Sequence, residues 1–168
     1  MNAPGMECVR LVRVDDRLIH GQVMTSWVKQ TAANKIMVVD DEVASNDLMK
    51  TVLKGVTPAD VKLGIFSVQK AVDRLIKGLK PTDRVIILVK TPVTVWRMQQ
   101  AGIDFPSLCV GGIGMRADRT TLYQNIACSE EEREALRGLI AAGCDVTIQI
   151  VADDSKISVA KILEKEQH

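Results

Sequence analysis

Hydrophobic residues along the chain gather into short runs that alternate with longer amphipathic stretches. The run RVIILV is rich in β-branched residues and carries no charge inside, which is typical of a strand covered on both faces. Six segments follow this pattern and are predicted strands: 9–14, 35–39, 61–66, 84–89, 107–110 and 145–151.

Between these runs, apolar residues recur at helical spacing, and residues that cap helices stand before them. Ser129 is followed three residues later by Glu132, which forms a capping box, and Pro92 occupies a first helical position. The predicted helices cover 22–33, 46–55 (capped by 45 or 46), 68–79, 91–102, 129–143 and the chain from about 155 onward. Residues 118–125 are left as either an irregular loop or an edge strand.

The alternation of strand and helix predicts an α/β protein. We expect a three-layer α/β/α arrangement, with a mostly parallel sheet of about six to seven strands and helices on both faces. At 168 residues and 46% hydrophobic content, the chain fits one domain, residues 1–168, with a full-sized core. No repeat, low-complexity segment or long linker divides it.

The charge balance argues against nucleic acid or a membrane surface as a partner. Lys and Arg total 22 and Asp and Glu total 21, and only 3% of the residues are aromatic, which leaves few platforms for base stacking. The four cysteines lack CxxC or zinc-like spacing, so we expect reduced thiols. With no secretory leader and no apolar run of membrane-spanning length, we expect a soluble cytoplasmic protein.

The segment VRVDDRLIHGQV, residues 12–23, places His20 at the end of the first predicted strand, while the other histidine, His168, is the last residue. In a parallel sheet the ligand crevice lies beyond the carboxyl ends of the strands. The loops 15–21 and 111–116 should therefore open onto the same edge.

The first of these loops leads into a helix whose initial N–H groups have no internal partner, and such a helix start favours anions. A histidine there can be neutral and nucleophilic near pH 7, and Arg17 stands close enough in sequence to neutralise phosphate oxygens. Among the acid–base and nucleophilic reactions open to such a histidine, accepting a phosphoryl group needs the fewest additional side chains. It depends mainly on positioning and charge stabilisation.

The segment VRVDDRLIHGQV resembles the active-site segment of the IIB component of the mannose/fructose/sorbose class of the bacterial sugar phosphotransferase system (PTS). The resemblance continues through MVVDDEVASND, LVKTPVTVWRMQQAGI, VGG and CSEEEREALRGLIAAGCDVTIQIV. It implies a parallel α/β sheet with helices on both sides and a phosphotransferase activity without a cofactor. A partner IIA component would phosphorylate His20 on Nδ1, and the phosphoryl group would pass to a sugar carried by membrane IIC and IID subunits.

Carried over residue by residue, the resemblance makes His20 the phospho-acceptor and Arg17 a phosphate ligand. Asp15 would orient either His20 or Arg17. The backbone at the helix start and in the second loop would approach the phosphate at four positions: Gly21, Gln22, Gly111 and Gly112.

Two positions depart from the family pattern: Cys109 stands where Asn is common, and Ala152 where Pro is common.

Several of these residues have a purely structural alternative. Arg17 can pair with Asp15 or Asp16, and a tight turn alone explains the glycines of the second loop. For the remaining positions we expect structural roles: an internal ion pair for Arg13, helix capping rather than a magnesium site for Asp40, Asp41 and Glu42, and core packing for Cys109.

Four arginines, Arg13, Arg17, Arg116 and Arg119, fall in or next to the two loops. Those that face outward should attract an acidic donor surface. Two other functions stay open. A histidine-dependent phosphatase of small metabolites would need an enclosed pocket and a general acid. A Rossmann-like nucleotide-binding module would need the GxGxxG that the first strand lacks.

Overall fold

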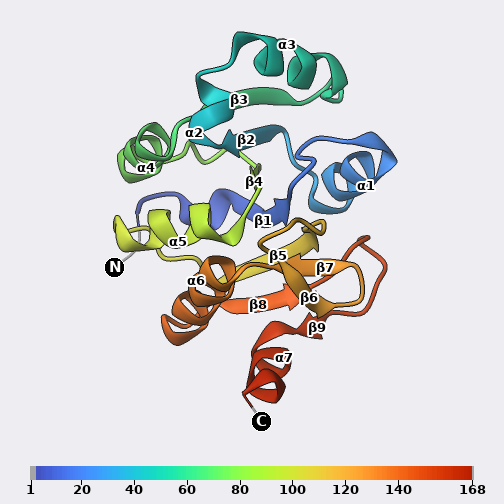
Figure 1. Cartoon of the computed structure of the whole chain (residues 1–168). Coiled ribbons are helices and arrows are strands. Elements are labelled where there is room, and N and C mark those ends of the chain that lie inside the picture. The colour runs from blue at the N-terminus through green and yellow to red at the C-terminus, as the bar shows by residue number, and fades with distance from the viewer. Residues whose placement is uncertain (1–2, 168) are drawn as a thin grey trace.

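The computed structural model describes residues 3–167, with the side chain of Gln22 outside the described part. Within that range the main sheet has the strand order β3-β2-β4-β1-β5-β8-β9, with helices on both faces (Figure 1). The predicted three-layer α/β fold is therefore confirmed. The strands of this sheet are β1 (Val9–Asp15), β2 (Lys35–Val39), β3 (Lys62–Phe66), β4 (Val85–Val89), β5 (Ser107–Gly112), β8 (Asp145–Ile148) and β9 (Ile157–Ser158).

All neighbouring strands of this sheet run parallel except β9, which pairs antiparallel with β8. A separate antiparallel hairpin consists of β6 (Thr120–Tyr123) and β7 (Ile126–Cys128). The helical segments are η1 (Met6–Cys8), α1 (Gly21–Thr31), α2 (Asp41–Ala44), α3 (Asp47–Val56), α4 (Val68–Lys77), α5 (Pro92–Gln100), α6 (Glu130–Ala141) and α7 (Val159–Glu166).

Strand β4 explains how the sheet supports a core on each face. Val85, Ile87 and Val89 pack with residues of α4, α5, α6 and α7, whereas Ile86 and Leu88 pack with residues of α1, α2 and α3. Successive side chains of a strand point to opposite faces, so a charge-free strand is what two apolar layers require. No helix within residues 3–167 has the length and apolar character needed to cross a bilayer.

The chain after β8 differs from the prediction. The expected strand 145–151 ends at Ile148, because the side-chain amide of Gln149 donates through Nε2 to the carbonyls of Ala152 and Asp154 and closes a turn. The last helix begins at Val159 rather than near 155, after the short strand β9.

Three further elements, β6, β7 and α2, were not predicted as such. The ambiguous segment 118–125 contains strand β6, whose partner β7 was missed. The one-turn helix α2 lies directly before α3 and was also missed.

Candidate functional site

The carboxylate of Asp15 lies at the centre of the loop that follows β1. Its Oδ2 is 2.9 Å from Nε2 of His20, and its Oδ1 accepts from the backbone N–H of Arg17 at 3.0 Å and from Nε of Arg17 at 3.2 Å. Only 1% of the Asp15 side chain is exposed. The sequence left open whether Asp15 orients His20 or Arg17, and in the structure it contacts both.

The protonation of this carboxylate fixes the hydrogen bond to His20. Burial raises the pKa of Asp15, but hydrogen bonds from His20 and Arg17 outweigh burial and hold the pKa below its usual value. An ionised carboxylate only accepts hydrogen bonds, so Nε2 of His20 must donate. In a neutral imidazole the lone pair then lies on Nδ1, and no hydrogen bond to Nδ1 is present among the described residues.

The loop holds His20 at the surface by burying the two residues before it. Leu18 and Ile19 are buried in the core that lies beneath α1. Leu18 has a φ of +57°, a conformation that non-glycine residues rarely adopt, and its N–H donates to the carbonyl of Asp15 at 2.9 Å. His20 itself is extended and is the N-cap of α1, with 22% of its side chain exposed.

The start of α1 is left open to an anion. The N-cap His20 makes no side-chain hydrogen bond to the helix, and the first turn holds no acidic residue. By contrast, Asn46, Ser67, Thr91, Ser129 and Ser158 each cap their helix through a side-chain oxygen. The first N–H groups of α1, including those of Gly21 and Gln22, therefore have no partner within the helix.

Arg17 is the most exposed charged group beside His20, with 58% of its side chain accessible. It forms the ion pair with Asp15 that the sequence left as an alternative, and it also lines a hollow of about 360 Å³ with Gly111, Gly112 and Ile150. A guanidinium in this position can bind Asp15 and still present N–H groups to an anion.

Gly111 and Gly112 belong to β5, so the tight turn considered for them is wrong. A Cβ at Gly111 would lie 2.1 Å from Cζ of Arg13, and a Cβ at Gly112 would lie 3.0 Å from Oδ1 of Asp15. These glycines leave room for the two buried charged side chains of the neighbouring strand. Their approach to a phosphate remains a proposal.

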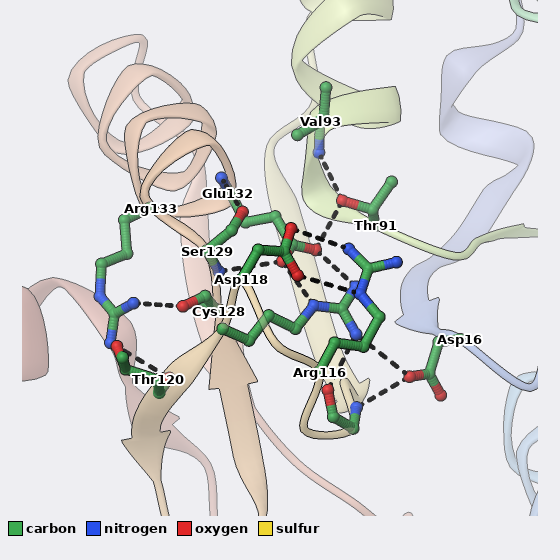
Figure 2. Close-up of polar contacts among 12 residues, drawn as sticks. Asp16, Thr91, Val93, Arg116, Asp118, Thr120, Cys128, Ser129, Glu132 and Arg133 are labelled. Atoms are coloured by element: carbon green, nitrogen blue, oxygen red, sulfur yellow. Dashed lines mark hydrogen bonds and ion pairs between the residues drawn. The ribbon is translucent and has the colours of Figure 1, made fainter.

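Asp16 belongs to a second network of polar contacts (Figure 2). Its carboxylate accepts from the N–H of Gly114 at 2.8 Å and lies 3.6 Å from Nη1 of Arg119. Arg119 in turn donates to both carboxylate oxygens of Glu132, at 2.7 and 3.0 Å, and Thr91 also donates to Glu132 at 2.8 Å. These contacts connect the loops after β1 and β5 to the starts of α5 and α6.

The sequence predicted Glu132 as part of a capping box, and the structure confirms this. Its ion pair with Arg119 was missed, because no local spacing signals a contact between a hairpin and a helix. Of the four arginines in or next to the two loops, Arg17 and Arg116 are exposed, whereas Arg13 and Arg119 are buried. The internal ion pair expected for Arg13 is confirmed, because its Nη2 lies 3.8 Å from Oδ2 of Asp15.

Two of the three carboxylates after β2, Asp40 and Asp41, bind helix starts as predicted, whereas no such contact within residues 3–167 tests the prediction for Glu42. Asp40 accepts from the N–H of Val43, and Asp41 accepts from the N–H of Val68 and from Arg97. Among the described residues, no group of three or more His, Cys, Asp or Glu side chains is placed to hold a metal ion.

The four cysteines are free and buried. Burial raises the pKa of Cys109, and it raises the pKa of Cys128 to about 12 and that of Cys144 to about 11. Because the thiolate is the nucleophile, buried thiols with raised pKa values are poor competitors of His20.

Comparison with known proteins gives consistent matches. Residues 9–168 match the family model described as PTS system sorbose subfamily IIB component. The chain is 34% identical to the mannose-specific EIIAB component of Escherichia coli (strain K12) over 94% of its own length, and it spans 49% of that relative. It is 33% identical to the sorbose-specific EIIB component of Lacticaseibacillus casei, covering 93% of this chain and 96% of the relative.

A solved structure agrees with these matches. The crystal structure of the IIBSor domain of the sorbose permease from Klebsiella pneumoniae superposes with a TM-score of 0.86 at 28% identity. The match covers 94% of this chain and 96% of that chain.

Proposed function

This chain belongs to the family of PTS system sorbose subfamily IIB components, and from that premise we propose that it carries a phosphoryl group on His20. The donor is a phosphorylated IIA component, and the acceptor is a sugar carried by membrane IIC and IID subunits. Residues 1–168 act as a single IIB domain in the cytoplasm. The names of the relatives, which are sugar-specific phosphotransferase components, support this class of reaction.

The observation that carries the proposal is the hydrogen bond between Nε2 of His20 and Oδ2 of Asp15 at 2.9 Å. It leaves Nδ1 as the ring nitrogen with a free lone pair, on a side chain that is partly exposed at an uncapped helix start. Nδ1 attacks phosphorus as the bond to the donor nitrogen breaks. The proton on Nε2 stays on the ring, where Asp15 stabilises the positive charge that develops.

The phosphoryl oxygens have two sets of donors beside Nδ1. Arg17 supplies a guanidinium, and the first turn of α1 supplies backbone N–H groups. This chemistry consists of positioning and charge stabilisation, which is what phosphoryl transfer mainly requires.

The openness of the site supports a protein donor rather than a small metabolite. His20 lines neither the 360 Å³ hollow beside Arg17 nor the larger hollow of about 480 Å³ on the other side of Asp16. A surface histidine can be reached by two protein partners in turn, through small and transient interfaces. A phosphatase of small metabolites would instead enclose its substrate.

Incubation with phosphoenolpyruvate, the general phosphotransferase proteins and the cognate IIA component tests the proposal. We expect one acid-labile phosphate per chain, absent in His20→Ala. Label that survives in His20→Ala, or that resists acid, would exclude the proposed site. Release of inorganic phosphate from small esters without any partner protein would favour the phosphatase alternative.

A further inference from the structure

The guanidinium of Arg13 lies directly behind the Asp15–His20 pair, and the residue is 0% exposed. Its Nη1 donates to the carbonyl of Gln149 at 2.8 Å, and its Nη2 donates to that of Ile150 at 2.7 Å. Nη2 also lies 3.8 Å from Oδ2 of Asp15, the same oxygen that binds His20. Arg13 therefore adds a buried positive charge to the carboxylate that orients the proposed nucleophile.

The surroundings of Arg13 fit a guanidinium group. Its Cζ lies 5.0 Å from the ring centroid of Trp27, and its Nη1 donates to Sγ of Cys109 at 3.2 Å. Gly111 on the adjacent strand leaves space that any larger residue would fill. Three elements, α1, β5 and the turn after β8, thus hold one planar cation in place.

Stability alone does not account for this arginine. Burying a guanidinium costs several kcal/mol, and a well-packed apolar side chain in its place is often neutral or stabilising. Among the described residues, Nε of Arg13 has no hydrogen-bond partner, which adds to that cost. A buried aliphatic side chain at this position of β1 would avoid both costs.

The charges around His20 indicate what Arg13 contributes. Asp15 faces the ring directly, Arg17 lies on the exposed side of that carboxylate, and Arg13 lies on its buried side. Asp16 is directed to Gly114 and Arg119, and the first turn of α1 has no acidic residue. Strand β5 contributes the thiol of Cys109. The positive charge of Lys156, in the segment before β9, lowers the pKa of that thiol, although burial outweighs it.

A buried carboxylate with no other partner would favour the imidazolium form of the histidine beside it. An imidazolium carries protons on both ring nitrogens, so it has no lone pair with which to attack phosphorus. A second cation at the same carboxylate oxygen opposes that outcome, because it offsets the negative charge that attracts the extra proton.

We propose that Arg13 is a positioning residue for phosphoryl acceptance, which balances and orients Asp15 so that Nδ1 of His20 stays unprotonated at neutral pH. This inference rests on the proposed function. In the transfer step the donor N–P bond breaks, the bond between Nδ1 and phosphorus forms, and the proton on Nε2 remains there. Arg13 touches none of the reacting atoms and acts only through Asp15.

The test compares Arg13→Met with Arg10→Met, an exposed arginine on the same strand. Transfer from phosphorylated IIA is measured from pH 6 to pH 9. We expect Arg13→Met still to take label on His20, but up to about tenfold more slowly at the acid end of this range, which is the limit set by a tenfold change in the protonation equilibrium. The deficit should close toward pH 9. Arg10→Met should follow the wild type throughout.

Two results with a folded Arg13→Met protein would overturn the inference and make Arg13 a structural residue. One is a transfer rate reduced by the same fraction at every pH, and the other is an unchanged transfer rate. Should Arg13→Met not fold, Arg13→Lys, which keeps a cation, serves in its place and should show a smaller deficit of the same pH dependence. Long-range ¹H–¹⁵N NMR of the wild type needs no variant. At pH 7.5 it should show a proton on Nε2 alone, and a ring protonated on Nδ1 would overturn the inference.

Failure of the proposed function gives a different pattern. In that case wild-type His20 takes no label at any pH. The NMR comparison of the wild type with the Arg13 variants still tests the role of Arg13, because it requires no donor. Extra protonation of the His20 ring in Arg13→Met supports that role, and identical spectra contradict it.

Discussion

Asp15 and His20, five residues apart, share a hydrogen bond of 2.9 Å between Oδ2 and Nε2. The carboxylate is almost fully buried and the imidazole is partly exposed, so the hydrogen bond connects the interior of the sheet to the surface. A buried acid that fixes which nitrogen of a histidine carries the proton is a recurring way to prepare the other nitrogen for chemistry.

Replacement of Asp15 by Asn keeps the shape of the side chain but removes the charge that selects the Nε2–H form of His20. We expect phosphoryl acceptance to slow by about tenfold or more, since a hydrogen bond to a charged group contributes ~1.5–3 kcal/mol. Stopped-flow transfer from phosphorylated IIA measures this. The exposed Asp60, replaced by Asn, is the control. A wild-type rate in Asp15→Asn would mean that the ring needs no orienting carboxylate.

Arg17 should contribute through the geometry of its guanidinium as well as its charge. In Arg17→Lys an ammonium cannot reproduce the planar fork that binds two phosphate oxygens, so we expect transfer to slow by about tenfold or more. Because 58% of the side chain is exposed, the fold should change little, and circular dichroism checks this. Undiminished transfer in Arg17→Ala with an intact fold would reduce Arg17 to a partner of Asp15.

Long-range attraction of the donor should depend on Arg116, which is exposed and pairs with Asp118 at 3.3 Å. Arg116→Glu should slow second-order transfer at low salt, and added salt should erase the difference as the screening length falls from ~10 Å at 0.1 M to ~3 Å at 1 M. Arg10→Glu makes the same charge change at the amino end of β1 and is the control. Equal slowing by both variants, or a salt-independent rate, would indicate apolar docking.

The buried pair of Glu132 and Arg119 should make stability depend on pH. Burial raises the pKa of Glu132, but hydrogen bonds from Arg119, the N–H of Ser129 and Thr91 outweigh burial and hold the pKa below its usual value. The stabilisation is therefore complete above the ordinary carboxyl pKa of about 4.3 and is lost as pH falls through the lowered value.

Glu132→Gln leaves Arg119 buried without its carboxylate and should destabilise the protein by about 3–5 kcal/mol at pH 7. Urea unfolding at pH 7 and at pH 3 should show this difference shrinking in acid. The exposed Glu134, replaced by Gln on the same helix, should change stability by less than about 0.5 kcal/mol. A difference that persists undiminished at pH 3 would show that the pair's charge does not stabilise the fold.

The sequence was most informative where the signal is local. The strand KIMVV has the bounds predicted for it, and the capping box at Ser129 begins α6 as predicted. His20 and its neighbours were found because they lie within one short segment whose residue types suit a single chemistry.

Contacts between distant segments gave no such signal. Arg13 forms the internal ion pair expected for it, with Asp15. Nothing in the sequence indicated its hydrogen bonds to the carbonyls of Gln149 and Ile150, which join residues more than 130 positions apart. The same turn ends β8 early and delays α7, because the side chain of Gln149 binds carbonyls that a continuing strand would direct elsewhere. The role of Gly111 likewise became visible only once the side chain of Arg13 was placed beside it.

The location of the phosphoryl group tests the central claim most directly. The protein, labelled with ¹⁵N in its histidine rings, is phosphorylated by IIA and examined by NMR for coupling between phosphorus and a ring nitrogen. The account predicts one coupled nitrogen, Nδ1 of His20, with the proton retained on Nε2 beside Asp15. Phosphorus on Nε2 of His20, on one of the cysteines, or on no residue of the chain would contradict it.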